Sequence, residues 1–336
     1  MLNIVAIGGG TGLSIILRGL KEISTAITAI VTVADDGGGS GVLREDLGML
    51  PPGDVRNCIL ALANKEPILQ DLFQYRFEEG RLKGQNFGNL MIAAMVGISD
   101  NFESAIRKIS DIFAITGEVY PVSEDDLVLY AKLDDGATVI GESNIPLEVL
   151  KRGSQIEKIW IEPSDASTSD VILKRIEAAD VIVLGPGSLY TSIIPNLLVP
   201  DIARAINETK ASVFYVANIM TQPGETDTLT AGEHLELLFK HTALSHVDFM
   251  IANSGDISTD SIRRYEREEA TPVRFEESDK ALLSTHNVTL IEGNFVDIKK
   301  GYIRHDAPAI AKEITGYVER SYNLKKSELN NLSKTI

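Results

Sequence analysis

The chain has 336 residues, 44% hydrophobic and 24% charged, which is enough for one large domain or two closely packed lobes. Its 32 basic and 48 acidic residues give a formal net charge of −16, so we expect neither nucleic acid nor an anionic membrane surface as a partner. The single cysteine, Cys58, excludes an internal disulfide. No signal peptide is recognised and the apolar runs are too short to span a bilayer, so the expected location is the cytoplasm.

A strand, a glycine run and a helix open the chain. Residues 4–7 form a short apolar run, and apolar residues recur at helical spacing from Leu13 to Leu20. Four of the five residues from Gly8 to Gly12 between them are glycine. Glycine backbone followed by the first N–H groups of a helix is suited to binding a phosphate. The alternative is a tight turn without a ligand, which would also contain glycine. We interpret this loop as a binding site for an anionic ligand.

Strand-like and helical segments alternate along most of the chain. This alternation predicts βαβ crossovers and the α/β class, with a Rossmann-like, mostly parallel sheet and helices on both faces. The expected strands cover residues 4–7, 27–34, 156–161, 181–184, 213–216 and 247–252, and the expected helices include 171–178, 201–207 and 233–241.

Two stretches interrupt this alternation. Residues 54–113 indicate a helical insert or lid, with helices over 54–64, 67–77, 87–97 and 102–113. Residues 116–150 are irregular and β-rich, with a hairpin whose turn is at Asp135 and Gly136. We expect a single domain over residues 1–325, a polar, frayed tail over 326–336, and a homodimer on base rate alone.

A second acidic and glycine-rich loop follows the strand at 27–34. Asp35 and Asp36 precede Gly37, Gly38, Gly39, Ser40 and Gly41, and the carboxyl ends of parallel strands meet at one edge, so both loops should open onto one crevice. Asp35 is also about 20 residues beyond the first glycines, as in a dinucleotide fingerprint. The third glycine of that fingerprint is replaced by Leu13, and no Lys-Ser or Lys-Thr follows as in a P-loop. An NAD-dependent dehydrogenase therefore remains a minor hypothesis.

Charged and amide side chains begin the next helices. Asp54 is the expected N-cap of its helix, and Arg56 is in the first turn, where a cation opposes the helix dipole and so indicates an anionic ligand. Asp35, Asp36 and Asp54 could together hold Mg²⁺, although each could also be a plain cap. Asn86 and Asn89 begin a later apolar helix, as caps or as ligand contacts.

The strand, glycine and helix arrangement recurs after residue 184. Gly185 to Ser188 supply glycines and a hydroxyl, and amide side chains that could recognise a base or sugar follow the next strands. The histidines have no zinc-ligand spacing and no Gly-x-Ser-x-Gly elbow is present, so serine or zinc hydrolase chemistry is unsupported. The expected ligand-binding residues are Gly8, Gly9, Gly10, Thr11, Gly12, Asp35, Asp36, Gly38, Ser40, Arg56, Asn57, Asn86, Asn89, Gly185, Pro186, Gly187, Ser188, Thr191, Asn218, Thr221, Gln222 and Asn253.

Six blocks of the sequence together resemble one protein family. They are VAIGGGTGL, VTVADDGGGSGVLRE, LPPGDVRN, NFGNL, GPGSLYTSIIPNLLV and ANIMTQPGET, within residues 3–320. The chain is similar to the YvcK-like gluconeogenesis factors of bacteria, a branch of the CofD-like (2-phospho-L-lactate transferase) superfamily. This resemblance implies a Rossmann-like core and binding of a UDP-sugar, UDP-N-acetylglucosamine in particular. It also implies a cytoplasmic role that links gluconeogenic growth to cell shape and peptidoglycan synthesis, with a cell-wall synthesis protein as a partner.

The transferase branch of the superfamily implies an alternative activity. There, the match to Asp35, Asp36 and Asp54 implies Mg²⁺ held against a nucleotide diphosphate, with Asp36 and Asp54 as the candidate catalytic residues. Gln85 stands where many relatives have histidine, which weakens an acid–base role at that position. The main hypothesis is a UDP-sugar-binding regulatory protein without catalysis, and the alternative is a Mg²⁺-dependent transferase of a phosphorylated group.

Overall fold

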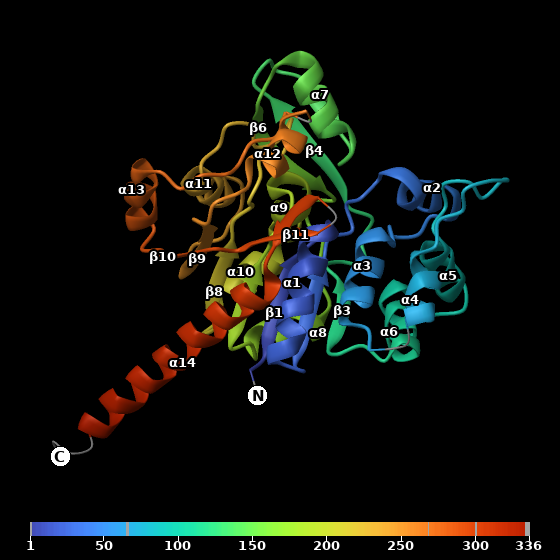
Figure 1. Ribbon diagram of the computed structural model, residues 1–336. Helices are drawn as coiled ribbons and strands as arrows, with labels where there is room; N and C mark the ends of the chain where they lie inside the picture. Colours follow the sequence, from blue (N-terminus) through green and yellow to red (C-terminus); the bar gives the residue numbers. More distant parts are fainter. Residues whose placement is uncertain (1, 65–66, 268, 300, 333–336) are drawn as a thin grey trace.

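Seven parallel strands form the central sheet, in the order β10-β9-β8-β7-β1-β2-β3 (Figure 1). All residues of β1, β2 and β7 are buried, as expected for parallel strands covered by helices on both faces. The α/β class and the Rossmann-like sheet are thereby confirmed. The computed structural model describes residues 2–64, 67–267, 269–299 and 301–332, with side chains up to residue 320. The seven strands are β1 (Ile4–Gly8), β2 (Ile27–Val31), β3 (Glu118–Pro121), β7 (Val181–Leu184), β8 (Ser212–Val216), β9 (Phe249–Asn253) and β10 (Thr289–Gly293).

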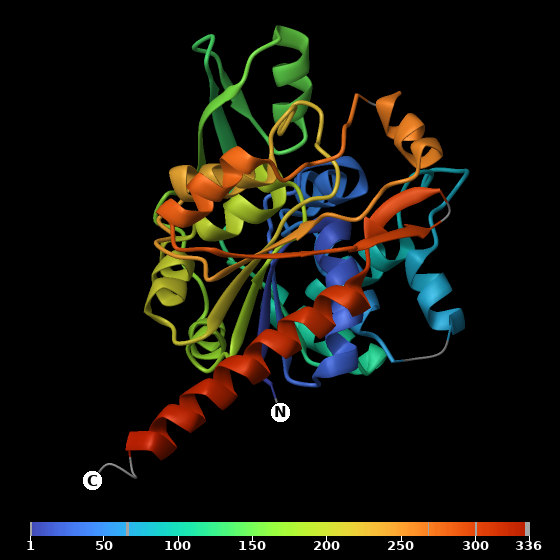
Figure 2. The same ribbon diagram turned by 60° about the vertical axis from the view of Figure 1, so that its left-hand side comes forward.

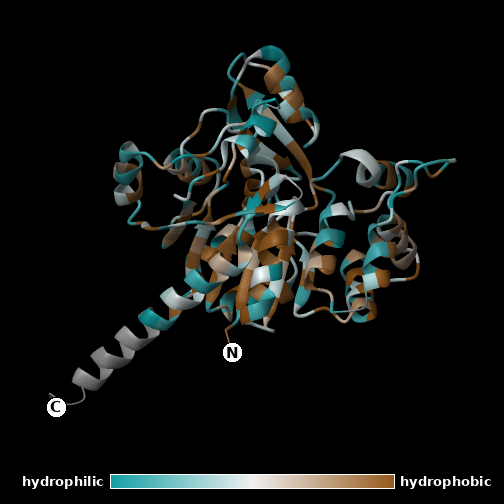
Figure 3. Ribbon diagram, in the orientation of Figure 1, coloured by the Kyte–Doolittle hydropathy of each residue, from teal (hydrophilic) through white to brown (hydrophobic). Residues whose placement is uncertain are grey.

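Helices cover both faces of this sheet. On one face, α1 (Gly10–Ile23) packs against α3 (Gly53–Leu62) and α14 (Ala307–Leu332), and on the other α8 (Asp170–Glu177) packs against α10 (Pro200–Glu208) (Figure 1). The apolar residues of α1 that recur at helical spacing are fully buried, because this stripe faces the sheet. The hydrophobic residues accordingly concentrate at the centre of the molecule (Figure 3).

The predicted helical insert is present but only partly separate. Its helices are α3, α4 (Pro67–Gln74), α5 (Phe87–Val96) and α6 (Phe102–Phe113). Because α3 packs on β2 and β3 and α6 packs on β3, these two helices belong to the layer that covers the sheet. Only α4 and α5 stand outside that layer, beside α2 (Gly38–Leu47) (Figure 1).

A small antiparallel sheet forms a lobe above the carboxyl ends of the main strands (Figure 2). It contains β4 (Val128–Leu133), β5 (Thr138–Ile140) and β6 (Ile156–Glu162), with α7 (Asn144–Arg152) beside them. The hairpin is confirmed, with Gly136 at φ +87° in the turn. The assignment of residues 156–161 to the parallel sheet was wrong. β6 pairs antiparallel with β4, and its exposed Glu157 and Lys158 show that it is not buried on both faces.

Three further segments differ from the prediction. Residues 119–121 were placed in the irregular stretch but belong to edge strand β3 of the main sheet. The prediction of a frayed tail was wrong up to Leu332, because α14 continues through that segment, which contains neither Gly nor Pro. Residues 333–336 lie outside the described residues. The hairpin of β11 (Val296–Lys299) and β12 (Tyr302–His305) was not predicted. The remaining helices are η1 (Leu189–Ile193, a π-helix), α9 (Ile194–Leu197), α11 (Ala231–His241), α12 (Thr259–Glu266) and α13 (Glu277–Thr285).

None of the helices among the described residues is long and apolar enough to cross a membrane.

Candidate functional site

Two glycine loops meet where the strand order reverses. From β1 the chain proceeds to β2 and β3 on one side, whereas from β7 it proceeds to β8, β9 and β10 on the other, and β1 and β7 are neighbours. Ligands of open α/β sheets bind at such a point, outside the carboxyl ends of the strands. The loops after these two strands are in contact, since a Cβ placed on Gly187 would lie 3.4 Å from the Gly9 carbonyl oxygen.

Close packing requires glycine at some positions of the first loop. The same loop also has backbone N–H groups with no acceptor among the described residues. A Cβ on Gly9 would lie 2.6 Å from Thr32 Cγ2, and a Cβ on Gly12 would overlap the Pro186 carbonyl. Gly10, at φ +62°, begins α1. Within the described part of the chain, no acceptor is bonded to the N–H groups of Thr11 and Gly12. Free donors of this kind at the start of a 14-residue helix are suited to an anionic group.

Two carboxylates adjoin this helix start. Asp54 is half-buried and accepts a hydrogen bond from the Gly10 backbone, and burial together with the charge of Asp35 raises its pKa to about 6. Burial also raises the pKa of Asp35, although the Gly37 N–H donates to its Oδ1 (2.9 Å) and Ser40 bonds to it. The predicted N-cap role of Asp54 was wrong. Pro52 is the N-cap, and Asp54 is in the first turn of α3 with its carboxylate directed at the first glycine loop.

Asp36 is engaged elsewhere. Its Oδ1 accepts a hydrogen bond from the Ser143 N–H (2.9 Å), which ties the loop after β2 to the small antiparallel lobe. Among the residues that the structure describes, no group of three or more His, Cys, Asp or Glu is arranged to hold a metal. The expected trio of Asp35, Asp36 and Asp54 is therefore reduced to a pair, Asp35 and Asp54. Such a pair suits Mg²⁺ when phosphate oxygens and water complete the coordination.

Arg56 is hydrogen-bonded to one amide side chain of its own helix α3 and to one at the start of α5. It donates to Asn89 Oδ1 (3.0 Å) and to Asn57 Oδ1 (2.9 Å), and its Nε has no partner within the described residues. Asn86 caps α5, because its side chain accepts from the Asn89 N–H (3.1 Å) and donates to the Gln74 carbonyl (2.9 Å). The capping interpretation thus holds for Asn86, while burial lowers the pKa of Arg56 to about 10.

The second glycine loop is bonded to the segment that follows β8. Asn218 Oδ1 accepts from the Gly187 N–H (3.2 Å), and Gln222 Nε2 donates to Ser188 Oγ. Thr191 Oγ1 donates to a carboxylate oxygen of Glu225 (3.2 Å). Four expected ligand-binding residues are therefore bonded to each other, namely Gly187, Ser188, Asn218 and Gln222, whereas Thr191 is bonded to Glu225. Gly185 and Pro186 precede them in the loop.

Glu225 caps the helix after this loop. Its carboxylate also accepts from the Tyr190 N–H (3.3 Å), so it takes the place at the start of η1 that an anionic ligand would take. Burial raises the pKa of Glu225 to about 7, and burial together with Asp35 and Glu225 raises the pKa of Glu142 to about 8. The predicted site omitted both residues. Glu225 was visible only as one polar residue in a turn, and no pattern marks Glu142.

We expect Glu225→Gln to flatten the dependence of stability on pH. The ordinary pKa of 4.5 in the unfolded chain rises to about 7 on folding, so the folded state retains a proton between these values. Stability therefore falls as the pH rises through this window, by up to roughly 3 kcal/mol. An amide accepts from Tyr190 and donates to Thr191 without this cost. Urea unfolding at pH 5 and pH 8 measures the difference, and Glu177→Gln, at an exposed site, should leave the wild-type pH dependence intact.

A cavity of about 400 Å³ lies between the two glycine loops and the C-terminal hairpin. Four polar residues that are not among the expected ligand-binding residues line it: Ser192 of η1, Tyr265 of α12, and Arg304 and His305 of β12. The Arg304 guanidinium contacts the Tyr265 hydroxyl (3.5 Å) and the Ile303 carbonyl (3.0 Å). Burial lowers the pKa of His305 to about 4, so its neutral ring donates from Nε2 to the Ala217 carbonyl (3.0 Å).

Two other expected residues have structural partners. Thr221 lines the cavity, but its Oγ1 accepts from the Thr271 N–H (2.9 Å). Asn253 does not line it, and its Oδ1 accepts from the Phe295 N–H (2.9 Å), which shapes the loop after β10. Gly38 begins α2 at φ +47° with open space around it.

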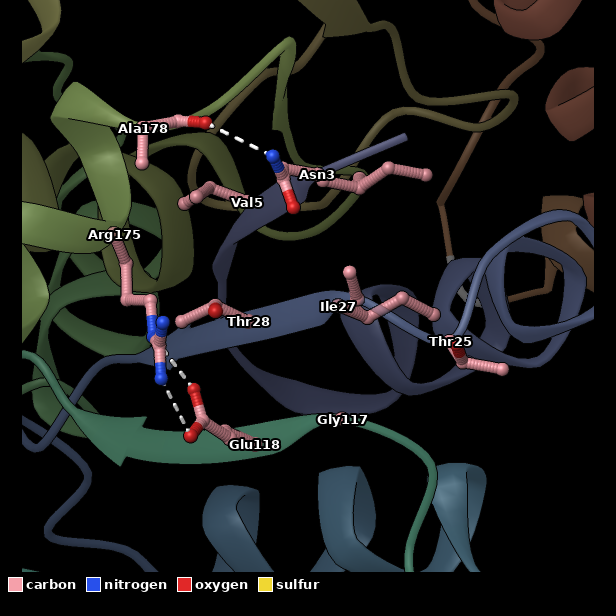
Figure 4. A pocket seen from close by; sticks show the side chains of 11 residues that line it. Asn3, Val5, Thr25, Ile27, Thr28, Gly117, Glu118, Arg175 and Ala178 are labelled. Atoms are coloured by element: carbon pink, nitrogen blue, oxygen red, sulfur yellow. Dashed lines mark hydrogen bonds and ion pairs between the residues drawn. The ribbon is translucent and has the colours of Figure 1, made fainter. Parts of the chain in front are cut away.

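A second cavity, of about 300 Å³, lies at the amino ends of β1, β2 and β3 (Figure 4). At its edge Arg175 pairs with Glu118 (2.7 Å), and Asn3 Nδ2 donates to the Ala178 carbonyl (3.2 Å). It lies at the opposite end of the strands from both glycine loops, and none of the expected site residues lines it.

Comparison with known proteins assigns a family to this arrangement. The profile of the family described as "2-phospho-L-lactate transferase CofD" matches residues 4–296. The chain is 53% identical over 317 residues to the "Putative gluconeogenesis factor" of Thermoanaerobacterium thermosulfurigenes, covering 94% of this chain and 97% of that protein. It is 43% identical over 310 residues to the "Gluconeogenesis factor" of Bacillus subtilis strain 168, covering 92% of this chain and 96% of that protein.

A solved structure has the same fold. The crystal structure of a UPF0052 family protein from Bacillus halodurans superposes with a TM-score of 0.89 at 43% sequence identity. The superposition covers 94% of this chain and 99% of that one.

Proposed function

Because the chain belongs to the CofD family and, within it, to the gluconeogenesis factors, we propose that it is a UDP-sugar-binding regulatory protein. The ligand we propose is UDP-N-acetylglucosamine. The protein would link gluconeogenic growth to cell shape and peptidoglycan synthesis through contact with a cell-wall synthesis protein. We propose that it functions as a homodimer in the cytoplasm.

The observation that carries this proposal is the free helix start inside the cavity. The unbonded N–H groups of Thr11 and Gly12 lie in the lining of the same cavity as Arg304. A chain with a net charge of −16 must attract an anion through such local donors. A diphosphate satisfies both the helix start and the guanidinium, while Asn218 and Gln222 offer amide groups to a sugar or a base.

Magnesium is compatible with the same ligand. Asp35 and Asp54 are the residues that would hold it, since both are acids whose pKa is raised by burial and neither forms an ion pair within the described residues. Bound there, Mg²⁺ would neutralise phosphate charge. This carboxylate pair is also what favours the second candidate function, a Mg²⁺-dependent transferase of a phosphorylated group. In that function Asp54, bonded to Gly10, would keep the glycine loop in place beside the phosphates.

Ligand-induced thermal stabilisation tests the proposal. UDP-N-acetylglucosamine, UDP-glucose, GDP, NAD and NADP are each added with and without Mg²⁺. A ligand at about 100 times its Kd contributes about 2.7 kcal/mol, which raises Tm by several degrees. We expect UDP-sugars to stabilise the protein even without metal. Stabilisation by NAD or NADP alone would support the dehydrogenase instead, and new phosphorus NMR signals from UDP-N-acetylglucosamine would support the transferase.

We expect Arg304→Ala to weaken UDP-N-acetylglucosamine binding by about tenfold or more, because a charge-assisted hydrogen bond contributes roughly 1.5–3 kcal/mol. The change removes a half-buried side chain from the cavity wall without touching either glycine loop. Titration calorimetry gives the Kd. Arg263→Ala, at an exposed position on α12, is the matched control and should bind as the wild type does. Equal Kd values for the two variants would show that Arg304 does not bind the ligand.

A further inference from the structure

One buried amide joins the backbones of the two glycine loops. Asn196 of α9 is completely buried. Its Nδ2 donates to the Gly8 carbonyl (3.1 Å) and to the Ser192 carbonyl (2.7 Å). Gly8 ends β1 at the first loop, and Ser192 is in η1 after the second loop. Asn196 is 188 residues from Gly8 in the sequence, so the two bonds connect the end of β1 to the helix that follows the second loop.

The surroundings of this amide make its presence costly. Asn196 Oδ1 has no hydrogen-bond partner among the described residues, and its neighbours Ile193, Ile194 and Leu197 are buried. A buried amide oxygen without a partner costs about 1–3 kcal/mol. An apolar side chain of similar size would avoid this cost, and the Gly8 carbonyl would still accept from the Thr32 N–H (2.9 Å), although the Ser192 carbonyl would lose the Asn196 donor. Stability alone therefore does not explain asparagine at this position.

We propose that Asn196 is a positioning residue for the two glycine loops that bind the nucleotide-sugar. The identity of that ligand rests on the function proposed above. Together with the Thr32 N–H, the Asn196 amide holds the Gly8 carbonyl, and so fixes the peptide from which the loop turns into α1 and the direction of the Thr11 and Gly12 N–H groups. With the same nitrogen it donates to the Ser192 carbonyl, which keeps the second loop in a fixed position relative to the first. The side chain itself does not line the cavity.

The test separates positioning from stability with two variants. Asn196→Leu removes both donors at similar volume. His234→Leu is the matched control, because His234 is equally buried, bonds one backbone carbonyl through Nδ1 (2.7 Å to Thr230), leaves Nε2 without a partner and is in α11, outside the cavity lining. Both variants should lower Tm. Only Asn196→Leu should raise the Kd for UDP-N-acetylglucosamine, by about tenfold or more, measured by calorimetry well below the variant's Tm.

A measurement without ligand keeps the inference independent of the proposed function. Amide hydrogen exchange of peptides covering residues 8–13 and 185–192 should accelerate in Asn196→Leu and stay at the wild-type rate in His234→Leu. If the wild type binds no UDP-sugar while this local acceleration occurs, the proposed function fails and the positioning role stands. Unchanged exchange in both peptides, or a wild-type Kd in Asn196→Leu, overturns the positioning role.

A second variant serves if Asn196→Leu does not fold. In Asn196→Asp, only the protonated acid can donate a hydrogen bond to a carbonyl. The Kd of this variant, divided by the wild-type Kd at the same pH, should therefore be closer to one at pH 5 than at pH 8. A ratio that does not change with pH contradicts the proposal.

Discussion

Replacing Gly12 with alanine is expected to abolish detectable UDP-N-acetylglucosamine binding and to lower Tm. The new Cβ would overlap the carbonyl of Pro186, a backbone group that cannot turn aside. Overpacking of this kind costs about 1–3 kcal/mol, and relief requires the two glycine loops to separate. Separation would also redirect the free Gly12 N–H, so affinity should fall by more than the roughly tenfold expected for one lost donor. Thermal unfolding and calorimetry measure the two effects.

Gly97→Ala is the control for the loss of a glycine. Gly97 follows α5 with φ −61°, and its Cβ would approach the Ala94 carbonyl no closer than 3.4 Å. This variant should keep both wild-type Tm, within a degree or two, and wild-type affinity. Wild-type affinity in Gly12→Ala would mean that the first glycine loop is only a tight turn.

Asp54→Asn is expected to stabilise the protein and to weaken its function. The ordinary pKa of 3.8 rises to about 6 on folding, so the folded state holds a proton that the unfolded chain has released between these pH values. Stability therefore falls as the pH rises through this window, and above pH 6 the cost is complete, on the order of 3 kcal/mol. Asparagine avoids it, so Tm should rise at pH 8 and change little below pH 4.

The functional half of this prediction concerns the metal. With the carboxylate removed, the part of the UDP-N-acetylglucosamine stabilisation that depends on Mg²⁺ should disappear, because Asp35 alone remains. The control is Asp248→Asn, since Asp248 is half-buried and accepts from the Val213 N–H (2.8 Å) at the amino ends of the strands. It should neither raise Tm at pH 8 nor alter the response to Mg²⁺. A lower Tm for Asp54→Asn at pH 8 would contradict the burial argument.

The sheet was predictable because its signals are local. Runs such as Ile4–Gly8 and Val181–Leu184 are apolar without alternation, as strands covered on both faces require, and the glycines that follow them mark the carboxyl edge. The same rule failed at residues 156–162, where Glu157 and Lys158 interrupt the apolar pattern. That interruption was a readable sign of a sheet exposed on one face.

The partners of the site residues were not predictable. Asp36 looked equivalent to Asp35, but its bond to Ser143 depends on where a lobe more than 100 residues away is placed. Arg304 and His305 reach the cavity because β12 folds back beside the loops, which no spacing in the sequence indicates. The glycine pattern predicted a ligand at the start of η1, but Glu225 occupies that position. Residue type located the crevice, whereas tertiary contacts decided which groups face it.

The central position of β1 has a consequence for biosynthesis. β1 is synthesised well before one of its two neighbours, β7, which begins at Val181, and the cavity wall is completed only by His305. A nascent chain can pair β1 with β2 early, but the other edge of β1 stays open until β7 has been made. Such late pairing slows folding and exposes intermediates to aggregation. The cavity is therefore complete only after residue 305 has been made, so a chain that stops before β12 would lack this part of the cavity wall.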